Sequence, residues 1–73
     1  MWVLAHAALM AVAACGSGEN EADALSVCSD ERQRQSQCIN DAAFQECVSC
    51  RQKCGRNCLQ NTPQTCPVQY HCR

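Results

Sequence analysis

The sequence predicts an all-α, small disulfide-rich fold, in which a helical hairpin and a short C-terminal segment are stapled by four disulfides. We expect a signal helix and a disordered tether in front of this domain. The chain has 73 residues and nine cysteines, a density typical of disulfide scaffolds in exported proteins and of metal-binding proteins in the cytosol. The segments between the cysteines contain good helix formers, and no stretch shows the alternation of a strand.

The first element is an apolar run over residues 2–14, broken only by His6, and the first 14 residues contain no Lys, Arg, Asp or Glu. A helix of this length spans about 20 Å, less than the ~30 Å hydrocarbon core of a bilayer. The run has no amphipathic pattern and stops at Gly16, which disfavours the alternative of a buried core helix. We therefore expect residues 1–14 to be a signal peptide.

The end of this run carries a recognisable motif, Val12-Ala13-Ala14-Cys15. It resembles the lipobox of bacterial lipoproteins, with Val12 at a position where Leu is preferred and without the usual basic residue near Met1. In that family, signal peptidase II cuts before the cysteine, whose sulfur carries diacylglycerol and whose amine is acylated by a fatty acid such as palmitate. The resemblance implies that Cys15 is lipidated and that the protein is anchored in the bacterial envelope. Gly16, where Asp favours inner-membrane retention, implies the outer membrane.

The number of cysteines agrees with this interpretation. Nine is odd, and an exported protein rarely keeps an unpaired thiol. With Cys15 used for lipid attachment, eight cysteines remain for four disulfides. The alternative cut, by signal peptidase I after Ala13, would leave all nine.

Residues 15–26 contain Gly, Ser and three acids, with Leu25 as the one large apolar side chain. This composition predicts a flexible acidic tether. The folded, Cys-rich domain is expected to comprise residues 27–73.

Two helices are predicted in this domain. The first covers residues 28–38, with Ser29 as N-cap and two acids in its first turn. Asn40 or Asp41 can cap the second, which Gly55 either ends or weakens. Residues 59–64 have the composition of a turn, and Pro67 is expected to start a short final helical turn.

Four cysteines share one face of the second helix if that helix continues to residue 58. At about 100° per residue they fall on a stripe about 80° wide, formed by Cys47, Cys50, Cys54 and Cys58. Neighbours on a helix face have Cβ atoms about 5–6 Å apart, whereas a disulfide needs about 3.5–4.5 Å. The stripe should therefore pair with the four flanking cysteines.

Antiparallel packing selects among these pairings, because paired positions in a hairpin have a nearly constant sum. The chain would turn once near residue 43 and again near residues 60–61. The predicted disulfides are Cys28–Cys58, Cys38–Cys47, Cys50–Cys72 and Cys54–Cys66. The domain's seven larger apolar side chains cannot offset the entropy of ordering it, so reduction is expected to unfold it.

Metal binding and redox chemistry are the alternatives to disulfides for these cysteines. Cys47 with Cys50, and Cys54 with Cys58, have spacings that suit a zinc site, but one helical stripe cannot surround a tetrahedral ion. A redox role for Cys47 and Cys50 lacks the surrounding strands of thioredoxin-type proteins. We predict no enzyme and no cofactor, because His71 has no acidic residue near it in the sequence.

Arg51, Lys53, Arg56 and Arg73 form a basic segment. They either contact an anionic envelope surface or form a solvated helix face. The net charge of −1 does not favour nucleic acid as a partner. We therefore expect a lipid-anchored structural or interaction protein of the envelope, which meets membrane lipid through Cys15 and a protein or envelope polymer through its domain. The alternatives are a secreted defence or toxin-like peptide and a thiolate zinc-binding protein.

Overall fold

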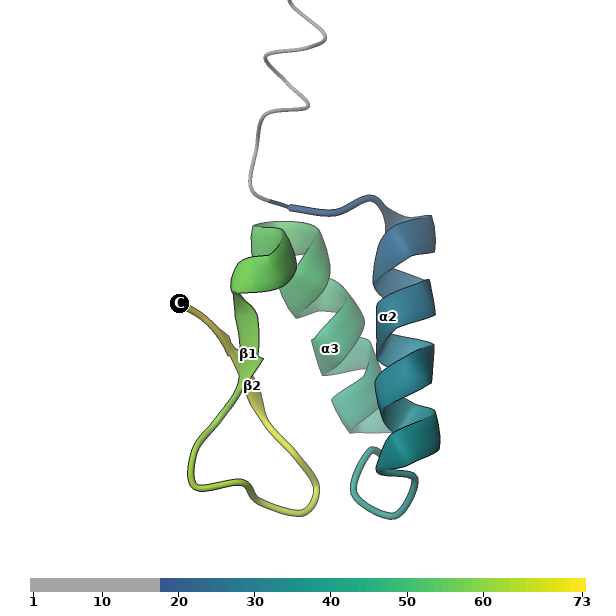
Figure 1. Ribbon diagram of the computed structural model, residues 1–73, viewed down its shortest axis with the longest axis vertical. Coiled ribbons are helices and arrows are strands. Elements are labelled where there is room, and N and C mark those ends of the chain that lie inside the picture. Colours follow the sequence, from purple (N-terminus) through teal and green to yellow (C-terminus); the bar gives the residue numbers. More distant parts are fainter. Residues whose placement is uncertain (1–17) are drawn as a thin grey trace, which may run out of the picture.

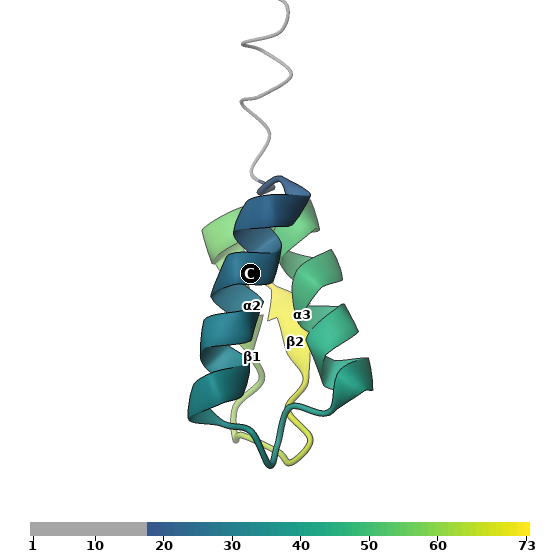
Figure 2. The ribbon, with the colours of Figure 1, turned by 90° about the vertical axis from the view of Figure 1, so that its right-hand side faces the viewer.

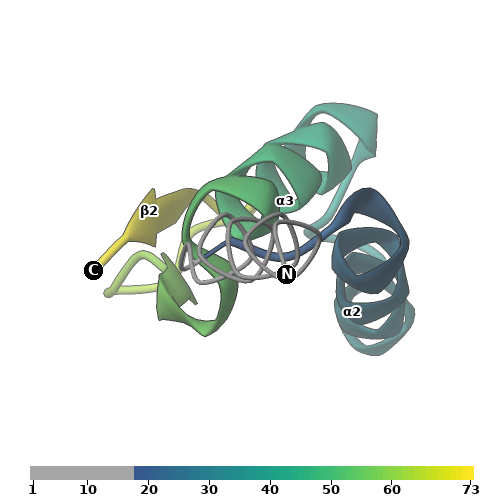
Figure 3. The same cartoon turned by 90° about the horizontal axis from the view of Figure 1, so that it is seen from above.

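The computed structural model describes residues 18–73, which form two helices and a small antiparallel sheet. Helix α2 (Glu21–Arg34) and helix α3 (Asp41–Cys54) run antiparallel and side by side (Figures 1 and 2). A 3-10 turn, η1 (Gly55–Asn57), leads into strands β1 (Cys58–Gln60) and β2 (Tyr70–Cys72). Seen from above, α3 lies between α2 and the strands (Figure 3).

The helical hairpin and the four disulfides are confirmed, but the domain is not all-α. The short final helix predicted after Pro67 is wrong, because residues 70–72 form β2 and pair with β1. Cys58 faces Cys72, Leu59 faces His71 and Gln60 faces Tyr70 in the register of this pair. Each strand has three residues, too few for an alternating pattern to be visible in the sequence.

Helix α2 begins earlier than the sequence predicts. Its N-cap is Asn20, whose side chain accepts a hydrogen bond of 2.8 Å from the backbone N–H of Asp23. Two acids in the first turn and two arginines in the last turn complement the helix dipole. Ser29, the predicted N-cap, lies inside the helix, and the buried face of α2 carries Ala24 and Cys28.

The predicted tether is therefore wrong for the part of it that the structure describes. Residues 21–26 belong to α2, and the two residues just before Asn20 pack on the end of α3. The backbone N–H of Glu19 donates to the carbonyl of Arg51 at 2.9 Å. A Cβ on Gly18 would lie 1.9 Å from the carbonyl oxygen of Gln52, so only glycine fits at this contact.

Helix α3 starts and ends where two residues of the sequence allow it. Asn40 is its N-cap and accepts 2.8 Å from the backbone N–H of Ala43, which confirms this predicted start. Gly55 ends it with φ of 56°, a left-handed conformation that favours glycine.

Arg32 of α2 joins the two helices at their lower end. Its guanidinium lies over the ring of Phe44, 5.3 Å from the ring centre, and forms a salt bridge of 2.7 Å with Asp41.

The core consists of three small clusters, and five of its ten buried residues are cysteines. One cluster lies between the helices (Ala24, Cys28, Cys47, Val48), one near the loops (Ile39, Ala43, Val68), and one between α3 and the strands (Cys50, Cys54, Cys58). Half-buried Tyr70 packs against all three. With so few aliphatic side chains buried, the disulfides replace a conventional core.

The predicted signal peptide, residues 1–14, and the lipidation residue Cys15 lie outside the described residues. Within residues 18–73, neither helix is long and apolar enough to cross a bilayer.

Candidate functional site

All eight cysteines of the described region are paired. The disulfides are Cys28–Cys47, Cys38–Cys66, Cys50–Cys58 and Cys54–Cys72, with Cα–Cα distances of 5.9, 4.6, 5.6 and 5.9 Å. None of the four predicted pairs, Cys28–Cys58, Cys38–Cys47, Cys50–Cys72 and Cys54–Cys66, is formed. The count of four disulfides is confirmed, and the predicted partners are wrong.

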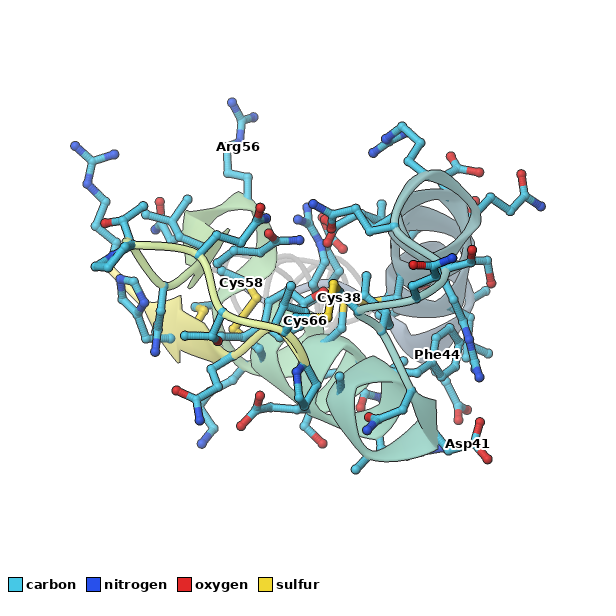
Figure 4. The ribbon with its side chains drawn as sticks, turned by 90° about the horizontal axis from the view of Figure 1, so that it is seen from below. Cys38, Asp41, Phe44, Arg56, Cys58 and Cys66 are labelled. Carbon is cyan, nitrogen blue, oxygen red and sulfur yellow. A yellow bond between two sulfur atoms is a disulfide. The ribbon has the colours of Figure 1, made fainter. Side chains whose placement is uncertain are left out.

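The predicted disulfide partners are wrong because the second helix ends at Gly55 and does not continue to Cys58. Because α3 ends there, Cys58 leaves the helix, turns back through η1 and bonds Cys50, a residue of the same predicted stripe. Cys47 then pairs with Cys28 across the helical hairpin, which turns at residues 35–40 instead of near residue 43. Cys38, in this turn, is left to bond Cys66 in the loop between the strands (Figure 4).

Two of the disulfides meet in one cluster of four sulfur atoms, which is the candidate site. Cys50 and Cys54 stand one turn apart on α3, with their Sγ atoms 3.8 Å apart. Their partners Cys58 and Cys72 face each other across the two strands. The Sγ atoms of Cys50, Cys54 and Cys72 all lie within 4.8 Å of one another. We name Cys50, Cys54, Cys58 and Cys72 the sulfur cluster.

The sulfur cluster is shielded on one side and open on the other. Cys50, Cys54 and Cys58 are only 7–8% exposed and pack against Tyr70, whereas Cys72 is exposed. The Sγ of Cys54 also lies 3.2 Å from the carbonyl oxygen of Cys50. A reagent from solvent therefore reaches the cluster through Cys72.

The chain matches no family model, no curated protein and no solved structure.

The zinc ligand set considered from the sequence is not brought together. Cys47, its first member, is fully buried against Cys28 in the cluster between the helices. Cys72, which spacing did not suggest, lies beside Cys50 and Cys54 instead. Cys47 and Cys50, considered as a redox pair, belong to two separate disulfides.

The four basic residues proposed for an anionic surface have different surroundings. Both oxygens of the Glu19 carboxylate accept from Arg51, at 2.9 and 2.7 Å. These bonds lower the pKa of Glu19 and raise the pKa of Arg51. Lys53, Arg56 and Arg73 are exposed, and none of them forms a salt bridge within residues 18–73. Figure 4 shows Arg56 pointing away from the domain.

A polar network between α2 and the strands was missed by the sequence analysis. Glu31 Oε1 accepts 2.9 Å from the phenol of Tyr70 and 3.0 Å from the side-chain amide of Gln60. The same amide donates to Gln35 at 2.8 Å. Burial, followed by the hydrogen bond to Glu31, raises the pKa of Tyr70. The spacing of Glu31 and Gln35, one helical turn apart, is the one signal of a shared face that the sequence offered.

His71 does not gain an acidic partner in the described region. Its Nδ1 forms a hydrogen bond with the side-chain oxygen of Asn61, the residue that follows β1.

Proposed function

We propose that this protein is an exported lipoprotein of the bacterial envelope, in which a lipid on Cys15 holds a disulfide domain at the membrane surface. The observation that carries the proposal is the pairing of all eight cysteines within residues 18–73. Four disulfides indicate an oxidising compartment, extracellular or otherwise outside the cytosol. Cys15, the ninth cysteine, thus has no intramolecular partner left among them.

The docking of Glu19 on Arg51 adds a geometric argument. Only Gly16 and Ser17 separate Cys15 from Gly18, which packs against the end of α3. The three residue steps from Cys15 to Gly18 span about 10 Å when extended. A lipid on Cys15 would therefore hold the domain close to the headgroups, with the end formed by α3 and η1 toward the bilayer.

This end carries the exposed cations Lys53, Arg56 and Arg73, which can contact anionic lipid or envelope polymer. The exposed acids Glu21 and Asp23 lie in the first turn of α2, at the same end. Because the charges are mixed, the proposal assigns anchoring to the lipid and gives the cations an auxiliary role. The domain itself is proposed to act as a structural or interaction module.

Mass spectrometry of the protein purified from its native host tests the proposal. We expect an N-terminal Cys15 that carries diacylglycerol and an acylated amine, and eight oxidised cysteines. Growth with a labelled palmitate should label the wild-type chain and the Cys28→Ser variant, but not the Cys15→Ser variant. An unmodified N-terminus near Ala14 would support the secreted peptide instead, and a chain that keeps Met1 and bound zinc would support the metal-binding alternative.

A further inference from the structure

The sulfur cluster gathers four potential ligands from three separate elements. Helix α3 supplies Cys50 and Cys54, the start of β1 supplies Cys58, and the end of β2 supplies Cys72. This arrangement removes the objection that ligands on one helical stripe cannot surround a metal ion. Groups that approach from a helix and two strands can take up the corners of a tetrahedron.

The spacing of the sulfur atoms matches a metal that thiolates favour. Zinc binds four thiolates tetrahedrally at about 2.3 Å, which places the sulfur atoms about 3.8 Å apart. The Sγ atoms of Cys50 and Cys54, which are not bonded to each other, are already 3.8 Å apart. We infer that Cys50, Cys54, Cys58 and Cys72 form a Zn(Cys)₄ site when both of their disulfides are reduced.

The conversion between the two states balances as a dithiol exchange. Each disulfide, Cys50–Cys58 and Cys54–Cys72, takes two electrons and two protons from an external dithiol, which closes to its own disulfide. The four thiols then lose four protons to solvent as four Zn–S bonds form. Cys72, the exposed member of the cluster, is the residue at which the attacking thiolate of the dithiol enters.

The sequence around the cluster cysteines is basic, which suits the charge of such a site. Zinc with four thiolates carries a net charge of −2. Lys53 and Arg56 flank Cys54 in the sequence, Arg73 follows Cys72, and no acidic side chain occurs after Glu46. Three of the four cysteines are only 7–8% exposed, which restricts competition from water.

The other two disulfides do not share these properties. Cys28 and Cys47 are fully buried between the helices, and Cys38 and Cys66 join two loops near the opposite end of α3. Within residues 18–73, Cys50, Cys54 and Cys72 of the sulfur cluster are the cysteines whose Sγ atoms all lie within 4.8 Å of one another. The inference goes beyond the proposed function and does not depend on a lipid at Cys15.

Zinc titration of the reduced full-length chain tests the inference. The protein is reduced with a phosphine without oxygen, and Zn²⁺ binding is measured by native mass spectrometry and by competition with a chromophoric chelator. We expect one Zn²⁺ per chain and a partial return of the far-UV helical signal. Co²⁺ in place of Zn²⁺ should give thiolate-to-metal charge-transfer bands and the intense visible bands of a tetrahedral site.

Two double variants with equal numbers of cysteines locate the site. Cys54→Ser with Cys72→Ser removes two cluster ligands, and should weaken Zn²⁺ binding about 100-fold or more. Cys38→Ser with Cys66→Ser removes two cysteines elsewhere, and should keep the affinity and the Co²⁺ spectrum of the wild type. Equal Zn²⁺ affinities of the two variants, or no Zn²⁺ bound by the reduced wild type, would overturn the inference. Since Cys15 is present in every chain compared, the result is independent of the lipid-anchor proposal.

Discussion

The phenol of Tyr70 donates a 2.9 Å hydrogen bond to Glu31 Oε1, and so ties the last strand to the first helix. Tyr70 also packs against all three core clusters. The disulfides join α2 to α3 and α3 to the strands, but none of them joins α2 directly to a strand. Contact between these outer elements therefore depends on the network of Tyr70, Glu31 and Gln60.

Replacing the phenol should cost measurable stability. Tyr70→Phe keeps the ring in the core but removes the hydrogen bond to a carboxylate. We expect the free energy of unfolding of the oxidised protein to fall by about 1–2 kcal/mol, as for bonds to charged groups at half-buried sites. Urea denaturation measures the change, with Phe44→Tyr as a control that adds a hydroxyl outside the network. A loss below about 0.3 kcal/mol would show that the bond contributes little.

The raised pKa of Tyr70 gives a second, spectroscopic prediction. The chain has one tyrosine, so the tyrosinate absorbance reports this phenol alone. Burial and the bond to Glu31 raise its pKa, and the unfolded chain ionises first as pH rises past about 10. The stability that the protonated phenol contributes is thus fully present below about pH 10, and it is lost as pH rises through the raised pKa of the folded state. A folded-state midpoint near 10 would contradict the buried placement of Tyr70.

The Glu19–Arg51 pair should contribute stability that depends on pH. The Arg51 hydrogen bonds lower the pKa of Glu19, so the contribution is present above the usual Glu pKa of about 4.3 and is lost as pH falls through the lowered folded value. Glu19→Gln should reduce the free energy of unfolding by about 1–2 kcal/mol at pH 7. In acid the difference from wild type should disappear. Asp30→Asn, which removes an exposed acid in the middle of α2, should show neither effect.

The close approach of Gly18 to α3 predicts that alanine is not tolerated there. A Cβ would overlap the Gln52 carbonyl, so Gly18→Ala must move the chain away from the helix end. The hydrogen bond from Glu19 N–H to Arg51 O should then open. Amide hydrogen exchange at Glu19 measures this, and should become faster, whereas Ser26→Ala, an exposed change on α2, should leave it unchanged. Unaltered protection of Glu19 in Gly18→Ala would mean that this segment does not pack as described.

The parts of the fold that were predictable depend on local chemistry. Asn40 can be predicted as a cap because its side chain accepts a hydrogen bond from a residue only three positions away. The two-helix arrangement can be predicted from the composition of the segments between the cysteines. Asn20 offers the same cap, but it lies among Gly, Ser and acidic residues that also suit a tether. The start of α2 is decided by the burial of Ala24 and Cys28 against α3, a contact that no local pattern shows.

The sulfur cluster could not be predicted from the sequence, because it also depends on a choice that local patterns do not decide. Its partners depend on whether Gly55 ends the helix, a choice that the sequence left open, because glycine both weakens helices and terminates them. Ending the helix moves Cys58 onto a strand opposite Cys72. That single backbone change leaves three of the stripe cysteines, Cys50, Cys54 and Cys58, in a cluster with Cys72 that is built from three elements.

The exposure of the cysteine residues predicts an order in which the disulfides are reduced. A thiolate must reach a disulfide sulfur before it can exchange. Cys66 and Cys72 are exposed, whereas Cys28 and Cys47 are fully buried. Under limiting dithiol in native buffer, Cys38–Cys66 and Cys54–Cys72 should therefore open first and Cys28–Cys47 last. Timed alkylation followed by peptide mass spectrometry measures the order.

Denaturant provides the control for this order, because in an unfolded chain all sulfur atoms are accessible and the four bonds should open at similar rates. Complete reduction in native buffer without zinc should remove the far-UV helical signal. Half of the ten buried core residues are cysteines, so few aliphatic side chains remain to hold the helices together. Early alkylation of Cys28 in native buffer would contradict its burial. A helical signal that survived full reduction would mean that packing, and not the disulfides, supplies most of the stability.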